Sequence, residues 1–162
     1  MKIFAVGWNY LNHNKEMNRA LLPKEPVLFM KPDTALFFLP PFSERIEYET
    51  ELVVRISRLG KNIAPRFAHR YYDAVTVGID FTARDLQARL RAEGSPWEIS
   101  KGFDGSAVVG DFIPVDEVAG NLQDLHFSLR IDGKEVQRGH TADMIFPVDE
   151  MIAYISRFYT LR

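Results

Sequence analysis

The chain has 162 residues, 46% of them hydrophobic and 12% aromatic, which fits one domain with a sizeable core. It contains no cysteine, and this excludes disulfides, thiolate metal sites and a cysteine nucleophile. With 20 basic and 22 acidic residues the formal net charge is −2, no basic stripe indicates nucleic acid, and no apolar run approaches a membrane span. We therefore expect a cytoplasmic protein that binds neither nucleic acid nor membrane.

Hydrophobic periodicity predicts a strand-rich α+β fold, because few connections resemble regular βαβ units. Runs rich in β-branched and aromatic residues, bounded by glycine or proline, are typical of strands. The predicted strands are Lys2–Val6, Val27–Lys31, Leu36–Leu39, Glu44–Ile56, Val75–Phe81, Ala107–Val109, Leu125–Ile131 and Glu135–Arg138. Asp132-Gly133 between the last two favours a tight hairpin turn.

Four segments are predicted to be helical from their apolar spacing and their start signals. They are Asn9–Met17, Pro65 to about Asp73, Ala83 to about Glu93, and Pro147–Tyr159. Thr82 and Asp85 resemble a capping box at the start of the third helix. The apolar face expected for the last helix consists of Val148, Met151, Ile152, Ile155 and Phe158.

Three glutamates share one face of the long strand over Glu44–Ile56, because strand side chains alternate with a period of two. They are Glu47, Glu49 and Glu51, and the opposite face, expected to pack in the core, holds Ile46, Tyr48, Thr50, Leu52 and Val54. Water could offset the repulsion between the carboxylates on an exposed face, and a divalent cation could do so in a cleft. Asp80 ends a later apolar strand, where it either forms a turn or joins Glu49 and Glu51 around Mg²⁺ or Mn²⁺.

Other candidate site residues have equally simple alternatives. Arg84 and Gln87 lie three apart on a predicted helix, where they could bind a substrate carboxylate and oxygen or form a solvated face. Lys101, in a glycine-rich turn, is either a surface lysine or a cation that stabilises a developing enolate. His13 and Glu16 would share a helix face as a general base and its partner, unless the segment is an exposed polar turn.

Six segments, taken in chain order, resemble the fumarylacetoacetate hydrolase family: GWNYLNHNKEM, EPVLFMKP, YETELVV, GIDFTARDLQ, SPWEISKGFD and GHTADMIFPVDEMIAYISRFYTL. They look closest to its short branch of acylpyruvate hydrolases and oxaloacetate decarboxylases. The E-x-E strand and the D-x-[ST]-A-R-D-x-Q segment are the most specific parts. The resemblance implies a single catalytic domain over residues 1–162, with the family's mixed β-sheet roll and few helices, and usually a homodimer.

The resemblance also implies roles for the acidic cluster. Glu49, Glu51 and Asp80 would ligate Mg²⁺ or Mn²⁺, and Lys101 would lie beside the metal and the 2-oxo acid end of the substrate. Glu47 is not a family ligand, and we expect it near the metal but outside the ligand set.

Four further residues match family positions. Arg84 and Gln87 would contact the substrate, while His13 and Glu16 match a dyad that activates water in relatives. The implied reaction is a Mg²⁺-dependent cleavage of a β-diketo acid, of the acylpyruvate or fumarylpyruvate type, to pyruvate and a carboxylic acid. The same site could serve an oxaloacetate decarboxylase or a 2-hydroxydienoate isomerase. A non-catalytic, metal-stabilised binding protein for 2-oxo acids is the alternative from another class.

The sequence departs from the family pattern in three places. Trp8 replaces the arginine of a G-R-N-Y start, so any substrate contact by that arginine is lost. Roughly five residues of a hairpin loop have no counterpart between Ala35 and Phe38, a change that costs little loop-closure entropy. The family pattern also continues past Arg162 into a strand and a T-G-T-P-x-G-V-G loop, and we therefore expect the intact protein to be heavier than this sequence.

Overall fold

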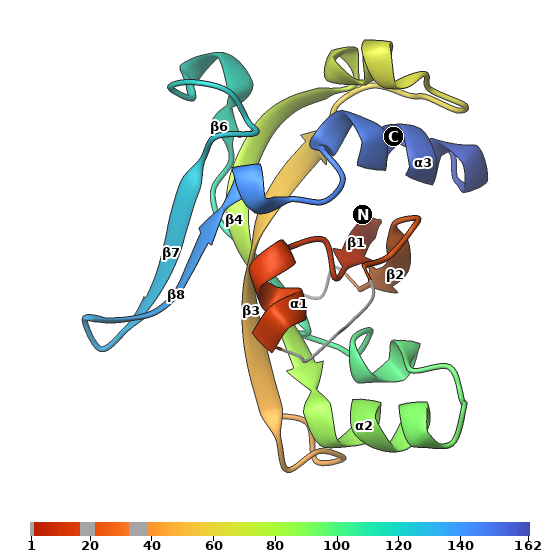
Figure 1. Cartoon of the computed structure of the whole chain (residues 1–162), viewed down its shortest axis with the longest axis vertical. Helices are drawn as coiled ribbons and strands as arrows, with labels where there is room; N and C mark the ends of the chain where they lie inside the picture. The colour runs from red at the N-terminus through yellow and green to blue at the C-terminus, as the bar shows by residue number, and fades with distance from the viewer. Residues whose placement is uncertain (1, 17–21, 33–38) are drawn as a thin grey trace.

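Two long antiparallel strands form the spine of the molecule in the computed structural model, which describes residues 2–16, 22–32 and 39–162. They are β3 (Ile46–Ile56) and β4 (Tyr72–Ala83), and both curve through the whole height of Figure 1. Short strands β5 (Ala107–Val109) and β6 (Ile113–Pro114) pair with β4. The strand-rich α+β architecture predicted from the sequence is confirmed.

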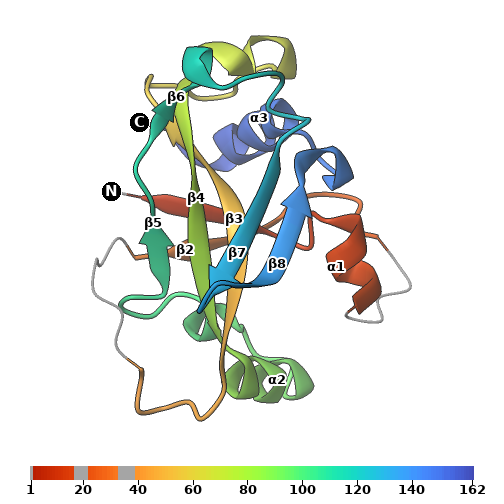
Figure 2. The same ribbon diagram turned by 90° about the vertical axis from the view of Figure 1, so that its left-hand side faces the viewer.

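Two pairs of antiparallel strands flank this spine on opposite sides. Figures 1 and 2 show the pair β1 (Ile3–Gly7) and β2 (Val27–Lys31) on one side, and the pair β7 (His126–Ile131) and β8 (Lys134–His140) on the other. β7 and β8 form a hairpin with the predicted turn, because Asp132 and Gly133 both have positive φ, at 50° and 78°. Leu36–Leu39 and the loop between Ala35 and Phe38 fall almost wholly outside the described residues.

Three α-helices and four short 3₁₀ helices connect the strands in the described part of the chain. The α-helices are α1 (Leu11–Glu16), α2 (Arg84–Ala92) and α3 (Val148–Phe158); the 3₁₀ helices are η1 (Pro65–Arg70), η2 (Glu98–Ser100), η3 (Val115–Glu117) and η4 (Thr141–Asp143). The helix predicted to run from Pro65 to Asp73 was too long, because the β3–β4 ladder already begins at Tyr72. No helix in the described residues is long and apolar enough to cross a membrane.

The larger core cluster lies under α3. Its buried members are Ile63, Ala68, Val148, Ile152, Ile155 and Leu161, with Leu52 and Val54 of β3 packed against it. The prediction that Phe158 belongs to the apolar face was wrong, since 55% of this residue is exposed in the last turn of α3. Ser156 is fully buried instead, and its hydroxyl accepts a hydrogen bond from the Ile63 amide and donates one to the Ala153 carbonyl.

The start of α2 also differs from the prediction. Thr82 does not cap the helix, because it stays in β4 directly opposite Glu47, and the N-cap residue Ala83 has no side-chain cap. Asp85 accepts hydrogen bonds from the Ser43 hydroxyl and the Glu44 amide, which joins the first turn of α2 to the segment before β3. A second core cluster of Ala83, Leu86, Leu90 and Phe103 fixes α2 against the sheet end.

Candidate functional site

Three carboxylates from the two long strands converge on one point. The β3–β4 register places Glu49 directly opposite Asp80, and Glu51 follows two residues along on the same face. Carboxylate oxygens of Glu49, Glu51 and Asp80 lie within 4.8 Å of one another, and only 3% of Asp80 is exposed. Asp80 is therefore the buried member of an acidic cluster, not a residue of a solvated turn.

Two buried lysines face this cluster. Lys101 Nζ donates to Glu49 at 2.9 Å and to Asp80 at 2.8 Å, and Lys31 Nζ lies 2.7 Å from the other Asp80 oxygen. Lys101 follows η2, where its amide bonds the Glu98 carbonyl. The alternative that Lys101 is a surface lysine is wrong.

Lys31 was missed by the sequence analysis. Its ammonium also donates to the carbonyls of Phe81, Lys101 and Ser106, so it connects β2 to the end of β4 and to the loop before β5. One signal was available: Lys31 shares a strand face with Phe29, and both are buried. A charged residue on an apolar strand face indicates a buried partner of opposite charge.

Arg84 orders the other edge of the cluster. Its Nε bonds Glu47, its Nη2 bonds Glu49 and its Nη1 bonds the Gln87 carbonyl oxygen, each at 2.6 Å. Gln87 is only 1% exposed, so this side of α2 is not a solvated helix face. Glu47 pairs with Arg84 and with Arg45, and it lies outside the group of three carboxylates, where it was expected.

The electrostatic environment separates Glu49 from Glu51. Burial alone would raise the pKa of Glu49, but the charges and hydrogen bonds of Lys101 and Arg84 lower it to about 2. Burial raises the pKa of Glu51 to about 8, with further repulsion from Asp80 and Glu49. Burial also raises the pKa of Asp80, against the attraction of Lys101 and Lys31. Glu51 is thus the member of the cluster whose negative charge the protein compensates least.

The cluster fits a hard divalent cation. Its donors are all carboxylate oxygens, which Mg²⁺ and Mn²⁺ prefer. The described residues give the half-buried Glu51 carboxyl no ion pair or hydrogen bond, while Glu49 and Asp80 each have a lysine. A carboxylate that is partly removed from water and has no partner is costly, and a cation shared with Glu49 and Asp80 would remove that cost.

The carboxylates lie in a cavity of about 630 Å³, which is also lined by Lys101, Arg84 and Gln87. Tyr10 and Asn12 line it as well, so α1 borders the cavity. His13 and Glu16 both lie on α1 as predicted, but their side chains are outside the described part of the structure. The segment leading into α1 is anchored by Asn14, whose amide donates to the Trp8 carbonyl at 2.8 Å.

Trp8 adopts a left-handed backbone conformation, with φ of 60°, between β1 and α1. Its ring lies 5.1 Å from the Arg91 guanidinium and 6.2 Å from the Trp97 ring, measured to the centroids. Trp8, Arg91 and Trp97 all line the cavity. Two aromatic rings and one guanidinium group therefore line the part of the cavity near position 8, where the family pattern has an arginine.

The whole described chain corresponds to one known family. Residues 2–162 match the family model described as the fumarylacetoacetate (FAA) hydrolase C-terminal domain. The chain belongs to the fumarylacetoacetate hydrolase family.

Named relatives share this sequence closely. It is 38% identical to the oxaloacetate tautomerase YcgM of Escherichia coli over 99% of this chain and 76% of the relative. It is 36% identical to the mitochondrial oxaloacetate decarboxylase of Dictyostelium discoideum, again over 99% of this chain and 76% of the relative. Both relatives are named as enzymes, but one name gives a tautomerisation of oxaloacetate and the other a decarboxylation.

A solved structure shares the fold. The fumarylpyruvate hydrolase of Pseudomonas aeruginosa, in complex with Mn²⁺ and pyruvate, superposes with a TM-score of 0.88 at 36% identity. The match covers all of this chain and 73% of the Pseudomonas chain. The predicted family and its α+β fold are both confirmed.

Proposed function

We propose that this chain forms the active site of a metal-dependent enzyme that cleaves a C–C bond of a β-diketo acid of the acylpyruvate or fumarylpyruvate type. The products would be pyruvate and a carboxylic acid. One observation carries the proposal: Glu49, Glu51 and Asp80 converge in a cavity beside a buried Lys101. The solved relative that contains Mn²⁺ and pyruvate supports the same substrate class.

Glu49, Glu51 and Asp80 would hold Mg²⁺ or Mn²⁺. When bound, the ion would act as a Lewis acid toward the 2-oxo acid end of the substrate and favour departure of pyruvate as its enolate. The protein's contribution begins with the strand register, which brings Glu49 and Asp80 together without a loop rearrangement. A site built on paired strands keeps the ligands in position before the substrate arrives.

Lys101 would stabilise the negative charge that develops on the 2-oxo oxygen. Its ammonium is buried and fixed by Glu49 and Asp80, so little reorganisation is needed as the charge forms. Arg84 and Gln87 would contact the substrate from α2. Glu47 holds the Arg84 guanidinium in place, and Arg84 in turn orients the Gln87 amide.

His13 and Glu16 would activate the water. Their spacing on α1 suits a histidine base with a carboxylate partner, and α1 borders the cavity. His13 would take a proton from water as the oxygen attacks the distal carbonyl carbon. The C–C bond then breaks, its electron pair leaves with the pyruvate enolate, and protonation of the enolate carbon gives pyruvate.

Oxaloacetate chemistry is the second candidate, and the names of the relatives support it equally well. Decarboxylation needs no attacking water, because the bond to the leaving CO₂ breaks directly and leaves the same enolate. Tautomerisation only moves a proton between carbon and the 2-oxo oxygen, and the isomerisation of a 2-hydroxydienoate is closely related. Lys101 would stabilise the enolate or enol oxygen in each case.

The remaining expectations are part of this proposal: a single catalytic domain, a homodimer and a cytoplasmic location. The alternative from another class is a metal-stabilised binding protein for 2-oxo acids without turnover. It predicts tight metal and oxalate binding with no product. Metal-dependent turnover that Lys101→Ala abolishes would eliminate it.

The experiment follows the ultraviolet decay of the acetylpyruvate enol with Mg²⁺ and with a chelator, beside a coupled assay for pyruvate from oxaloacetate. Fast, metal-dependent loss of acetylpyruvate supports the hydrolase. Faster turnover of oxaloacetate, to CO₂ or between its keto and enol forms, supports the second candidate. If metal is bound but acetylpyruvate, oxaloacetate and fumarylpyruvate are all left unchanged, both candidate functions are contradicted.

A further inference from the structure

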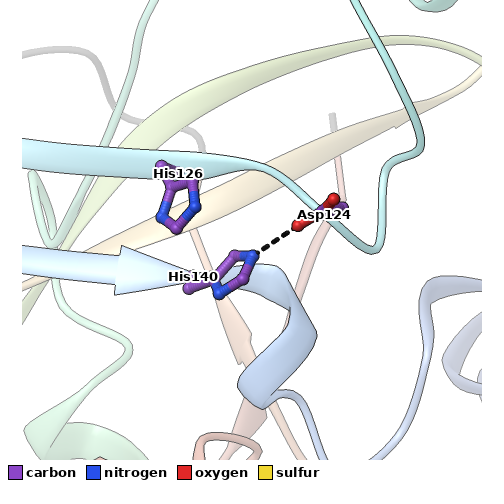
Figure 3. Close-up of side chains that lie close together, drawn as sticks. All are labelled: Asp124, His126 and His140. Carbon is purple, nitrogen blue, oxygen red and sulfur yellow. Dashed lines mark hydrogen bonds and ion pairs between the residues drawn. The ribbon is translucent and has the colours of Figure 1, made fainter.

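A second cluster of metal-binding side chains lies at the base of the β7–β8 hairpin. Its members are Asp124, in the turn before β7, His126, the first residue of β7, and His140, the last residue of β8. Figure 3 shows the two imidazoles side by side, with Asp124 reaching the His140 ring. One ligand atom from each residue lies within 4.8 Å of the other two.

The strand register creates this arrangement. His126 and His140 are direct cross-strand partners, so their side chains project from the same face of the hairpin. Their rings are stacked, with centroids 3.8 Å apart and planes inclined by 20°. Two imidazole nitrogens bound to one ion at ~2.1 Å in tetrahedral geometry lie roughly 3.4 Å apart, so the two rings are near enough to chelate an ion once they turn out of the stacked arrangement and direct one nitrogen each at it.

The backbone around the cluster is already fixed. Thr141, which is fully buried, donates its amide to the Leu125 carbonyl at 2.9 Å and accepts the Leu125 amide on its hydroxyl at 2.8 Å. These two bonds join the residues next to His126 and His140. A ligand set on such a frame loses little conformational entropy when it closes on an ion.

The third residue completes a recognisable donor set. Asp124 Oδ1 lies 2.7 Å from His140 Nε2. The Asp124 carboxylate is therefore close enough to bind the same ion as the His140 imidazole. Asp124 is 74% exposed in its side chain, which leaves room for water as a further ligand. Two imidazoles and one carboxylate suit Zn²⁺ and its borderline neighbours, whereas the all-oxygen cluster of Glu49, Glu51 and Asp80 suits Mg²⁺.

We propose that Asp124, His126 and His140 form a second metal site at the base of the β7–β8 hairpin. This site prefers Zn²⁺ and similar borderline transition-metal ions over Mg²⁺. The site shares no residue with the carboxylate cluster, although His140 lines the same cavity. Gln137 lies three residues before His140 and bonds the Thr50 amide and hydroxyl of β3. An ion at the hairpin base would therefore stiffen a hairpin that contacts the strand carrying Glu49 and Glu51.

The experiment is a Zn²⁺ titration of the full chain by calorimetry, with Mg²⁺ in excess to occupy the carboxylate cluster. Co²⁺ in a parallel titration reports nitrogen ligands through its visible absorption. We expect one Zn²⁺ per chain that Mg²⁺ does not displace, and a loss of affinity of roughly tenfold or more in His126→Ala and in His140→Ala, since each removes one of three ligands.

Two control variants test whether Zn²⁺ binding depends on these histidines in particular. His69→Ala removes an exposed histidine from η1 and should leave the Zn²⁺ affinity unchanged. His140→Asn keeps a polar side chain beside Asp124, and it should lose Zn²⁺ while keeping the thermal stability of the metal-free protein. Zn²⁺ binding that persists in the double variant His126→Ala/His140→Ala, or that disappears when Mg²⁺ is in excess, would overturn the proposal.

Discussion

Glu51 lies directly opposite Gly78 in the β3–β4 ladder, so its cross-strand neighbour has no side chain that could pair with its carboxyl group. A side chain at this position has little room, because a Cβ on Gly78 would approach the Val108 carbonyl oxygen and Val53 Cγ2 at 2.8 Å. The charge of Glu51 is therefore left for a bound cation to neutralise. An uncompensated charge on Glu51 strengthens metal binding and lowers the stability of the metal-free protein.

The first prediction is that Glu51→Gln abolishes tight metal binding but stabilises the metal-free protein at alkaline pH. The pKa of Glu51 is about 8, above its ordinary value of 4.5, so its contribution to stability is present in acid and is lost as the pH rises through about 8. Glutamine keeps the shape and never ionises. Thermal unfolding in a chelator should show a melting temperature difference in favour of Glu51→Gln that widens from pH 6 to pH 9.

Glu44→Gln is the matched control, because Glu44 is exposed just before β3. It should change neither metal affinity nor the pH dependence of the melting temperature. A Glu51→Gln protein that binds Mn²⁺ as tightly as the wild type would remove Glu51 from the ligand set.

The second prediction concerns protons released by the metal. At pH 7 the Glu51 carboxyl of the metal-free protein is mostly protonated, so a cation must displace that proton. The apparent Mn²⁺ affinity should rise by about tenfold per pH unit below pH 8 and level off above it. Calorimetry in buffers of different ionisation enthalpy should find close to one proton released at pH 7 and almost none at pH 9. Equal proton release at both values would contradict the assignment.

Much of the fold could be predicted because its signals are local. The alternation along Ile46–Ile56 and the Asp132-Gly133 turn each determine a structure within a few residues. Thr82 shows where local reasoning fails: it has a capping sequence, but the ladder to Glu47 keeps it in the strand. At Thr82, strand pairing with a distant segment of the chain therefore outweighs the local preference for a helix cap.

The same distinction applies to the site. Glu49, Glu51 and Asp80 were predicted from strand alternation and from the family resemblance, and the register then shows them together. The partners of Lys31 could not be identified from the sequence, because Asp80 and Ser106 are far away from it along the chain. The apposition of His126 and His140 likewise depends on the exact hairpin register, which Gly133 and its turn determine.

The third prediction is that Lys31→Met lowers the stability to unfolding by about 3–5 kcal/mol, the usual cost of removing one partner of a buried ion pair. The Asp80 carboxylate loses one of its two cations, and three carbonyl groups lose a donor. Urea unfolding measures the effect, and Lys2→Met, an exposed lysine next to β1, is the control. If Asp80 carries the cost, adding Asp80→Asn to Lys31→Met should destabilise less than the sum of the two single changes.

The fourth prediction separates hydrolysis from decarboxylation. His13→Ala should lower kcat for acetylpyruvate by about 10²–10⁴-fold, the usual range for a general base, because the attacking water loses its proton acceptor. Oxaloacetate decarboxylation needs no such water and should be much less affected. Steady-state assays of both substrates with the same preparation give the ratio, with His69→Ala as the control. Equal losses for the two substrates would argue against water activation by His13.

The fifth prediction tests the packing that links the β7–β8 hairpin to the cavity. Gly139 lies directly opposite Phe127, whose ring would lie only 2.3 Å from a Cβ at position 139 and also contacts the Tyr10 ring edge-on. Gly139→Ala must therefore displace the ring, and we expect a destabilisation of about 1–3 kcal/mol in urea unfolding. Gly7→Ala is the control, because its nearest contact would be an ordinary 3.6 Å. In a Phe127→Leu background the cost of Gly139→Ala should shrink, since the obstructing ring is gone; an unchanged cost would mean that the backbone at Gly139, and not the ring, excludes a side chain.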